Sequence, residues 1–272
     1  MNVKKDASGR RYVETEIEVS GTPEEVWKAI ASGPGISSWF VPTEFKENDG
    51  KPVSVHLSFG PGMEIVSEVT AWNPPRSYAT KAGLPRSPAL ANEWSVEARD
   101  GGICIVRIVQ SLFASTDDWD DQLESAKSGL ASFLCILQIY LRHFRGQRSS
   151  MMKWMVPVAG TEAEAWESLT EALGIKGLSV GDHCVAASGV PSFSGEVEYV
   201  TLSPFDALLR LDKPGPGVAA FGAVNFGGPS MVAMNFYLYG DEADGIIAQE
   251  TPHWQAWFQE RFPIPEASNE AS

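Results

Sequence analysis

The chain has 272 residues with 43% hydrophobic side chains, which is enough for two domains of ordinary size that each bury a core. Its formal net charge of −14 is unevenly placed: residues 1–150 carry 16 basic and 19 acidic side chains, whereas residues 151–272 carry 5 and 16. The acidic second half would be repelled by phosphate backbones and anionic lipid surfaces. Composition and charge therefore argue against disorder, nucleic-acid binding and membrane-surface binding.

The cellular compartment is predicted from the cysteines and the apolar runs. Cys104, Cys135 and Cys184 form neither a CxxC pair nor a disulfide framework, which is typical of buried thiols in a reducing compartment. The N-terminal segment lacks an apolar signal core. The longest nearly unbroken apolar run, Leu130–Leu141, is too short to span a bilayer. We therefore expect a cytoplasmic protein without a membrane span.

Two helices are predicted from similar segments, TPEEVWKAIASGPGI from Thr22 and TEAEAWESLTEALGI from Thr161. In each, the threonine precedes a glutamate by three positions, which is the spacing of a capping box at a helix N-terminus. Trp27 and Trp166 then lie on apolar stripes that are predicted to face a sheet. Five identities at a constant offset of 139 residues indicate a structural repeat.

Short segments rich in Val, Ile, Phe and Trp follow each of these helices, separated by turn residues such as Asn73-Pro74-Pro75 and Asp100-Gly101-Gly102. A closing helix follows each series. The first is predicted over about residues 117–145, and the second is expected to kink or break at Pro252. Each half is thus predicted to run from a capped helix through an antiparallel meander to a closing helix.

Domain boundaries follow from these elements. We predict one domain over residues 1–146, a shortened second domain over 151–264 and a mobile tail over 265–272, with a polar joint, GQRSS, between the two domains. The long helix is apolar on nearly all sides around Leu130, Cys135 and Ile139. This surface is predicted to be covered by the second domain, by a second copy of the chain or by another protein partner.

Several short motifs carry a resemblance to a known superfamily. They are TPEEVW from Thr22, Ser38-Trp39-Phe40, VTAWNPP from Val69, the strand pair around Asp100, and Ser128-Gly129-Leu130 with Leu134, Leu137 and Leu141. Through them the chain resembles the SRPBCC superfamily, which includes START lipid-binding domains and birch-pollen-allergen-like proteins. Within it, the chain is most similar to the branch named for activators of the heat-shock-protein-ninety ATPase. The resemblance covers residues 10–145 well and is weaker over 151–262, where a second Trp-Phe pair after the first helix is lacking.

The resemblance implies an α+β helix-grip fold, in which a curved antiparallel sheet wraps a long C-terminal helix, here in two tandem copies of which the second is abbreviated. It also implies a cavity between sheet and helix, which many members use for apolar ligands. The residues expected at this cavity are Trp39, His56, Trp72, Tyr78, Glu93, Trp94, Phe133 and Leu137. The resemblance supplies no catalytic signature.

The predicted function is non-enzymatic: binding of a small apolar ligand, or a protein interaction of the ATPase-activator type. No histidine has metal-ligand spacing and no nucleophile or phosphate-binding motif occurs, so no catalytic residue, cofactor or metal is predicted. Two alternatives stay open. One is a polyketide cyclase-like enzyme with His56 or Glu93 as acid or base. The second is a structural or regulatory protein that binds a partner through the long helix.

Overall fold

The computed structural model describes residues 3–6, 10–83, 89–112, 120–202, 205–225 and 228–263. The chain divides into two compact units, Met1–Arg148 and Ser149–Ser272, called unit 1 and unit 2 below. The predicted tail over 265–272 and the first predicted turn of the long helix, at 117–119, lie outside the described residues.

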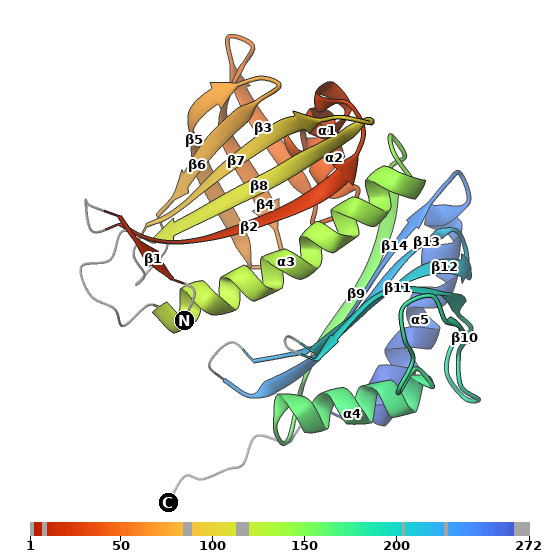
Figure 1. Cartoon of the computed structure of the whole chain (residues 1–272). Helices are drawn as coiled ribbons and strands as arrows, with labels where there is room; N and C mark the ends of the chain where they lie inside the picture. The colour runs from red at the N-terminus through yellow and green to blue at the C-terminus, as the bar shows by residue number, and fades with distance from the viewer. Residues whose placement is uncertain are drawn as a thin grey trace, which may run out of the picture. The chain divides into compact units, whose positions relative to one another are not determined.

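Unit 1 is a curved antiparallel sheet with three helices (Figure 1). Its strands are β1 (Lys4–Lys5), β2 (Arg11–Ser20), β3 (Thr43–Asn48), β4 (Lys51–Ser58), β5 (Glu64–Asn73), β6 (Ser77–Ala82), β7 (Leu90–Arg99) and β8 (Ile103–Leu112), and its helices are α1 (Pro23–Ile30), α2 (Gly33–Ser37) and α3 (Asp120–His143). The strand order is β1-β2-β8-β7-β6-β5-β4-β3. Because β2 pairs with the last strand, β8, the closing helix α3 returns across the sheet and packs mainly on β2.

Unit 2 repeats this plan with a smaller sheet. Its strands are β9 (Ser149–Val158), β10 (His183–Val185), β11 (Ser194–Leu202), β12 (Phe205–Lys213), β13 (Gly217–Val224) and β14 (Ser230–Tyr239), and its helices are α4 (Glu162–Leu173) and α5 (Ala243–Arg261). The order is β10-β11-β12-β13-β14-β9, so the first strand again pairs with the last. The sheet has six strands against eight in unit 1. The predicted fold class is confirmed: α+β, helix-grip, two tandem copies with the second abbreviated.

Both predicted capping boxes are present. The Glu25 and Glu164 amides each donate to the preceding threonine hydroxyl at 3.3 Å, and the Thr22 and Thr161 amides each donate to the following glutamate carboxylate at 2.8 Å. These bonds satisfy amides that a helix N-terminus otherwise leaves without partners. The repeat extends one residue further back than predicted, to Gly21 and Gly160, which have φ values of 137° and 90°.

The two capped helices end differently. In unit 2, Gly174 takes the left-handed conformation with φ of 80°, and the Ile175 amide donates back to the carbonyl of Thr170 at 2.9 Å. This glycine therefore reverses the chain away from the helix axis. In unit 1, Ala31 at the end of α1 has φ of −128°, and Ser32 directly caps a second short helix, α2.

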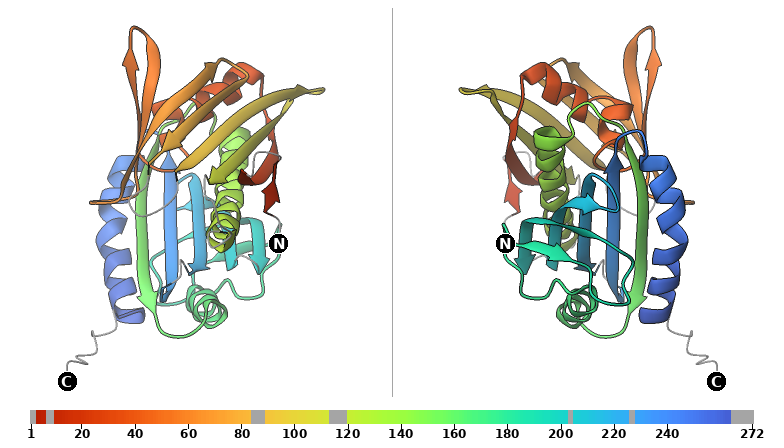
Figure 2. Two further views of the ribbon diagram at one scale, coloured as in Figure 1. Left: turned by 90° about the vertical axis from the view of Figure 1, so that its left-hand side faces the viewer. Right: turned by 90° about the vertical axis from the view of Figure 1, so that its right-hand side faces the viewer.

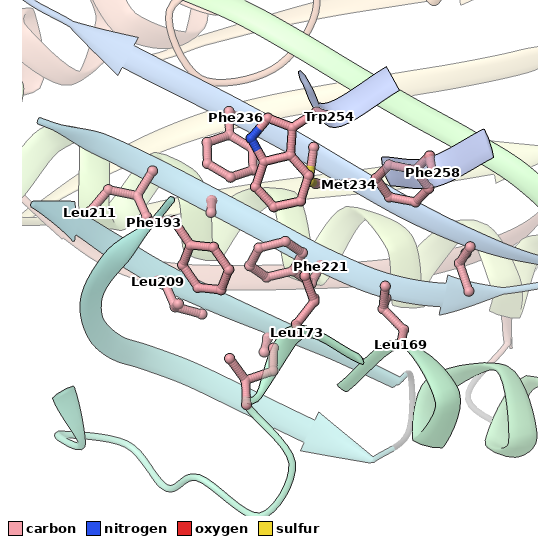
Figure 3. Packing of buried hydrophobic residues seen from close by; sticks show 14 of the residues in the cluster. Leu169, Leu173, Phe193, Leu209, Leu211, Phe221, Met234, Phe236, Trp254 and Phe258 are labelled. Atoms are coloured by element: carbon pink, nitrogen blue, oxygen red, sulfur yellow. The ribbon is translucent and has the colours of Figure 1, made fainter. Parts of the chain in front are cut away.

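Unit 2 has a continuous aromatic and aliphatic core (Figure 3). Helix α4 crosses β12, β13 and β14, whereas α5 lies along β9 and β14 (Figure 2). Pro252 does not break α5, which is one helix from Ala243 to Arg261. The buried rings of Trp254 and Phe258 lie just after the proline and attach this half of the helix to the core, which compensates for the amide that proline lacks.

Candidate functional site

A cavity of about 150 Å³ lies in unit 1 between the sheet, α2 and α3. Its walls are apolar and aromatic side chains with a few hydrogen-bonding groups. The lining residues are Ile36, Trp39, Phe40, Val55, Leu57, Phe59, Ile65, Ser67, Tyr78, Thr80, Leu90, Asn92, Trp94, Ile108, Gln110 and Leu130. They come from α2 and the residues just after it, from strands β4 to β8 with Phe59 just after β4, and from one residue of α3, so the cavity has the position that the helix-grip arrangement leaves between sheet and helix.

Three aromatic residues form one wall. The rings of Tyr78 and Trp94 are stacked, with centroids 6.1 Å apart and planes 4° apart, and the Trp39 ring meets Trp94 edge-on at 6.5 Å. The polar ends of this wall are already bonded: Trp39 Nε1 donates to the carbonyl of Ala29 at 2.9 Å, and the Tyr78 hydroxyl donates to the carbonyl of Ile30 at 2.7 Å. Burial raises the pKa of the Tyr78 phenol. The wall therefore presents carbon to the cavity.

These two bonds also explain how the wall is held. Carbonyls in the last turn of a helix have no partner within the helix. Ala29 and Ile30 belong to the last turn of α1, so Trp39 and Tyr78 satisfy carbonyls that the short helix leaves free. The aromatic wall and the end of α1 therefore stabilise each other.

A polar row crosses the sheet at the cavity floor. Gln110, Asn92 and Thr80 are register partners on the adjacent strands β8, β7 and β6. Gln110 Nε2 donates to Asn92 Oδ1 at 3.0 Å, whereas Gln110 Oε1 is buried and has no hydrogen-bond partner among the described residues. A buried acceptor without a donor costs about 1–3 kcal/mol. A ligand that carries a hydroxyl or N–H group would remove that cost.

The two predicted polar candidates lie on strand positions that alternate with the lining residues. His56 stands between Val55 and Leu57 on β4, and its Nε2 is 3.0 Å from Ser54 Oγ. Glu93 stands between Asn92 and Trp94 on β7 and forms an ion pair with Arg10. Since successive side chains of a strand point to opposite faces, both belong to the outer face of the sheet.

The remaining predicted residues surround the lining. The Trp72 ring is 5.1 Å from Trp27 and 5.6 Å from Tyr78, and the Phe133 ring is 4.5 Å from Phe40, which lines the cavity. Leu137 is fully buried. Trp39, Tyr78 and Trp94 are thus the candidates that the structure brings into the lining itself.

Sequence reasoning missed the polar row. A signal did exist in the strand alternation: Asn92 precedes Trp94 by two positions, and Gln110 follows Ile108 by two. Each therefore shares a face with a large apolar residue of its strand. Neutral amides give no chemical motif in a sequence, so this signal did not single them out.

The surface predicted for a partner has mixed exposure. Leu130 lines the cavity, Cys135 is partly exposed and Ile139 is 3% exposed. A contact of α3 with another protein or a second copy stays a prediction. Within the described residues, no three or more His, Cys, Asp or Glu side chains are grouped so that they could hold a metal ion. The described helices also include none that is long and apolar enough to cross a membrane.

Comparison with known proteins adds a family match. Residues 10–129 match the family described as polyketide cyclase / dehydrase and lipid transport, which is slightly less than half of the chain. No curated protein matches.

Solved structures with similar folds have low sequence identity. The di-domain ARO/CYC BexL from the BE-7585A biosynthetic pathway is 12% identical, over 94% of this chain and 100% of that chain, with a TM-score of 0.46. Protein MLL2253 from Mesorhizobium loti is 24% identical, over 49% of this chain and 98% of that chain, with a TM-score of 0.43. For the Aha1 dimer from Colwellia psychrerythraea the identity is 18%, over 50% of this chain and 98% of that chain, with a TM-score of 0.39.

The family match extends from β2 into α3 and covers the cavity-lining residues except Leu130. It supports the superfamily resemblance drawn from the capped helix and the Trp72-Asn73-Pro74-Pro75 strand end, and with it a ligand-binding or cyclase-like function. Residues 10–129 of this chain are therefore similar to the family described as polyketide cyclase / dehydrase and lipid transport.

Proposed function

We propose that unit 1 binds a small apolar molecule that carries one hydrogen-bond donor, and that it does so without catalysing a reaction. The observation that carries this proposal is Gln110 Oε1, which is buried and without a partner among the described residues, at the floor of a mostly apolar cavity. The family match supports it, because the family's description includes lipid transport.

The cavity volume limits the ligand. A dry cavity of about 150 Å³ holds roughly one benzene-sized molecule. Burying a ring with about 150 Å² of apolar surface stabilises a complex by about 4 kcal/mol, which corresponds to a dissociation constant of about 1 mM. A monocyclic phenol fits the size and donates to Gln110 Oε1. Larger ligands such as sterols, fatty acids or polyaromatics would require α2 or α3 to move.

A cyclase-like reaction has less support from the site. An acid or base must come within hydrogen-bond reach of the reacting group. The described polar lining residues are Ser67, Thr80, Asn92 and Gln110, which do not titrate near neutral pH, and the Tyr78 hydroxyl, which is bonded to Ile30. His56 and Glu93 belong to the opposite face of their strands.

Protein binding stays a prediction, in two forms. A protein interaction of the ATPase-activator type would change the ATPase rate of a heat-shock-protein-ninety chaperone on addition of this protein, and an unchanged rate would rule out that interaction. Association through α3 would give a dimer mass in light scattering at micromolar concentration, and a monomer mass would argue against it.

The ligand proposal is tested by comparing phenol with toluene, which has the same shape but no donor. Binding of each is followed by NMR through the indole N–H signals of the whole chain. In the Gln110→Leu variant, the ratio of phenol to toluene affinity should fall about tenfold, because only phenol loses a hydrogen bond. An unchanged ratio would contradict the role of Gln110.

A second variant tests the location. Ser67 is buried on β5 and lines the cavity, so Ser67→Leu should fill it and abolish binding of both molecules. Glu68→Leu places the same side chain on the opposite, exposed face of the same strand and should leave binding unchanged. If both variants bind equally well, the ligand site lies elsewhere.

A further inference from the structure

Unit 2 contains a larger pocket of about 600 Å³. It lies between α4, the segment that follows α4, and strands β11 and β12. Its lining residues are Trp166, Glu167, Thr170, Ile175, Lys176, Gly177, Leu178, Val197, Val200, Thr201, Ala207 and Leu209. This volume is within the range of about 300–1,000 Å³ that is usual for small-molecule sites.

The chain path after α4 explains the pocket. Gly174 turns the backbone in the left-handed conformation, and an added Cβ there would lie 3.0 Å from Cβ of Ala187. The chain then continues through Ile175 and Leu178 as a loop, at the point where unit 1 has α2. Strand β11 also has a register shift between Val197 and Tyr199, which bends it locally. Helix α5 packs on β9 and β14, so it leaves this part of the sheet to α4 and the loop.

The pocket combines an apolar floor with a charged rim. Trp166, Val197 and Leu209 are buried and supply carbon from three different elements. At the rim, Lys176 Nζ is 2.7 Å from Glu167 Oε1 and 3.8 Å from Glu171 Oε2. The hydrogen bond to Glu167 raises the pKa of Lys176, so this amine stays protonated. Two carboxylates therefore face one ammonium group.

The rim carries excess negative charge in a region that is itself acidic. Residues 151–272 hold 5 basic and 16 acidic side chains. A carboxylate ligand would have to enter against this field, whereas a cationic group would be attracted by it. We propose that this pocket is a second ligand site, and that it takes an apolar molecule with a positively charged end, such as an arylalkyl amine. The aryl group would pack against Trp166 and the sheet, and the ammonium group would lie at Glu167 and Glu171.

The experiment compares three probes with one apolar body: 1-naphthylmethylamine, 1-naphthalenemethanol and 1-naphthaleneacetate. Binding to the whole chain is measured by calorimetry at low ionic strength. All measurements use the Ser67→Leu background, in which the unit 1 cavity is filled. The amine should bind most tightly and the acetate most weakly. Because the rim is exposed, Glu167→Gln should weaken amine binding by only about two- to fivefold and leave the alcohol unchanged.

A matched pair of variants tests the location. Leu178→Trp places an indole in the pocket wall, whereas Val180→Trp places it on a neighbouring residue of the same loop that is 62% exposed. Leu178→Trp should reduce amine binding at least tenfold, and Val180→Trp should leave it unchanged. Val200→Trp on β11 provides a second blocking variant if Leu178→Trp does not fold. The proposal is overturned if no probe binds, if the acetate binds best, or if the folded blocking variant binds the amine normally.

Discussion

Units 1 and 2 begin with the same capped helix and diverge where that helix ends. Ala31 leads directly into the cap of α2 in unit 1, whereas Gly174 reverses the chain in unit 2. In unit 1, Ile36, Trp39 and Phe40 then fill space over the sheet and leave a cavity of about 150 Å³. In unit 2, a loop takes that place and leaves a pocket of about 600 Å³. A difference in the conformation of one helix terminus therefore accompanies two quite different sites.

The glycines that align in the repeat show this divergence directly. Gly35 and Gly174 are 139 residues apart and both precede an isoleucine. Gly35 lies inside α2, where an added Cβ would lie 1.9 Å from the backbone carbonyl of Lys28. Gly174 instead provides a positive φ. The same residue is required in one unit for close backbone approach and in the other for a turn.

The largest expected loss of stability comes from truncating the fully buried tryptophan of α5. Trp254 is fully buried between Phe193, Phe236 and Phe258, so Trp254→Ala should lower the free energy of unfolding by about 3–5 kcal/mol. Denaturant unfolding with hydrogen exchange should localise the loss to unit 2. Trp257→Ala, on the same helix at a partly buried position, should lower the free energy of unfolding by less. Equal costs would mean that burial of Trp254 does not anchor α5.

The two aligned glycines should differ in their sensitivity to alanine. Gly35→Ala should lower the free energy of unfolding by about 3 kcal/mol. The new Cβ would collide with backbone atoms, so α2 must shift. Gly174→Ala should lower the free energy of unfolding by about 1–2 kcal/mol, mainly because the left-handed backbone conformation is unfavourable for a residue with a side chain. Thermal and denaturant unfolding measure both. If the two costs are the same, the contrast between close approach and turn geometry is wrong.

The capping threonines should be equivalent in the two units. Thr22→Ala and Thr161→Ala each remove one hydroxyl that accepts a bond from the helix, so each should cost about 1 kcal/mol. Thr→Ser at either position keeps the acceptor and serves as the control. A difference of more than about 1 kcal/mol between the units would show that the capping box contributes unequally to their stability.

The smallest expected effect is a difference between the two capping glutamates in how much each contributes to the pH dependence of stability. The Thr22 amide, and then the Arg145 guanidinium, lower the pKa of Glu25; the Thr161 amide and hydroxyl lower the pKa of Glu164. A lowered folded-state pKa contributes stability above the unfolded pKa of about 4.3, and this stability is lost as pH falls through the folded pKa. Melting temperatures measured from pH 6 to pH 3 should therefore decrease.

Glutamine variants separate the two caps. Glu25→Gln and Glu164→Gln keep a neutral acceptor for the threonine amide but do not titrate. Each should flatten the decrease in melting temperature, and Glu25→Gln should do so more, because Arg145 Nη1 also donates to Glu25 at 2.8 Å. The Arg145→Gln variant should remove that difference. Equal flattening in the presence of Arg145 would contradict an unequal contribution from the ion pair.

Local sequence signals were sufficient for the repeated architecture. Thr22 with Glu25 and Thr161 with Glu164 predicted both helix starts, and the alternating apolar segments predicted two antiparallel sheets with closing helices. These signals depend on hydrogen bonds and periodicities within a few residues, so they can be recognised without the fold. Of the kink or break expected at Pro252, the break does not occur, because its local cost is offset by burial of Trp254 and Phe258 against distant strands.

The sites depended on the tertiary structure. Trp39, Tyr78 and Trp94 could be nominated as aromatic residues, but Gln110, Asn92 and Thr80 meet only because β8, β7 and β6 pair in a particular register. His56 and Glu93 were nominated for their chemistry, and strand alternation puts them on the opposite face. The sequence alone determined which segments are helices and strands and that they repeat. The tertiary structure alone decided which side chains share a cavity, because strand register and helix termini bring together residues that are far apart in the chain.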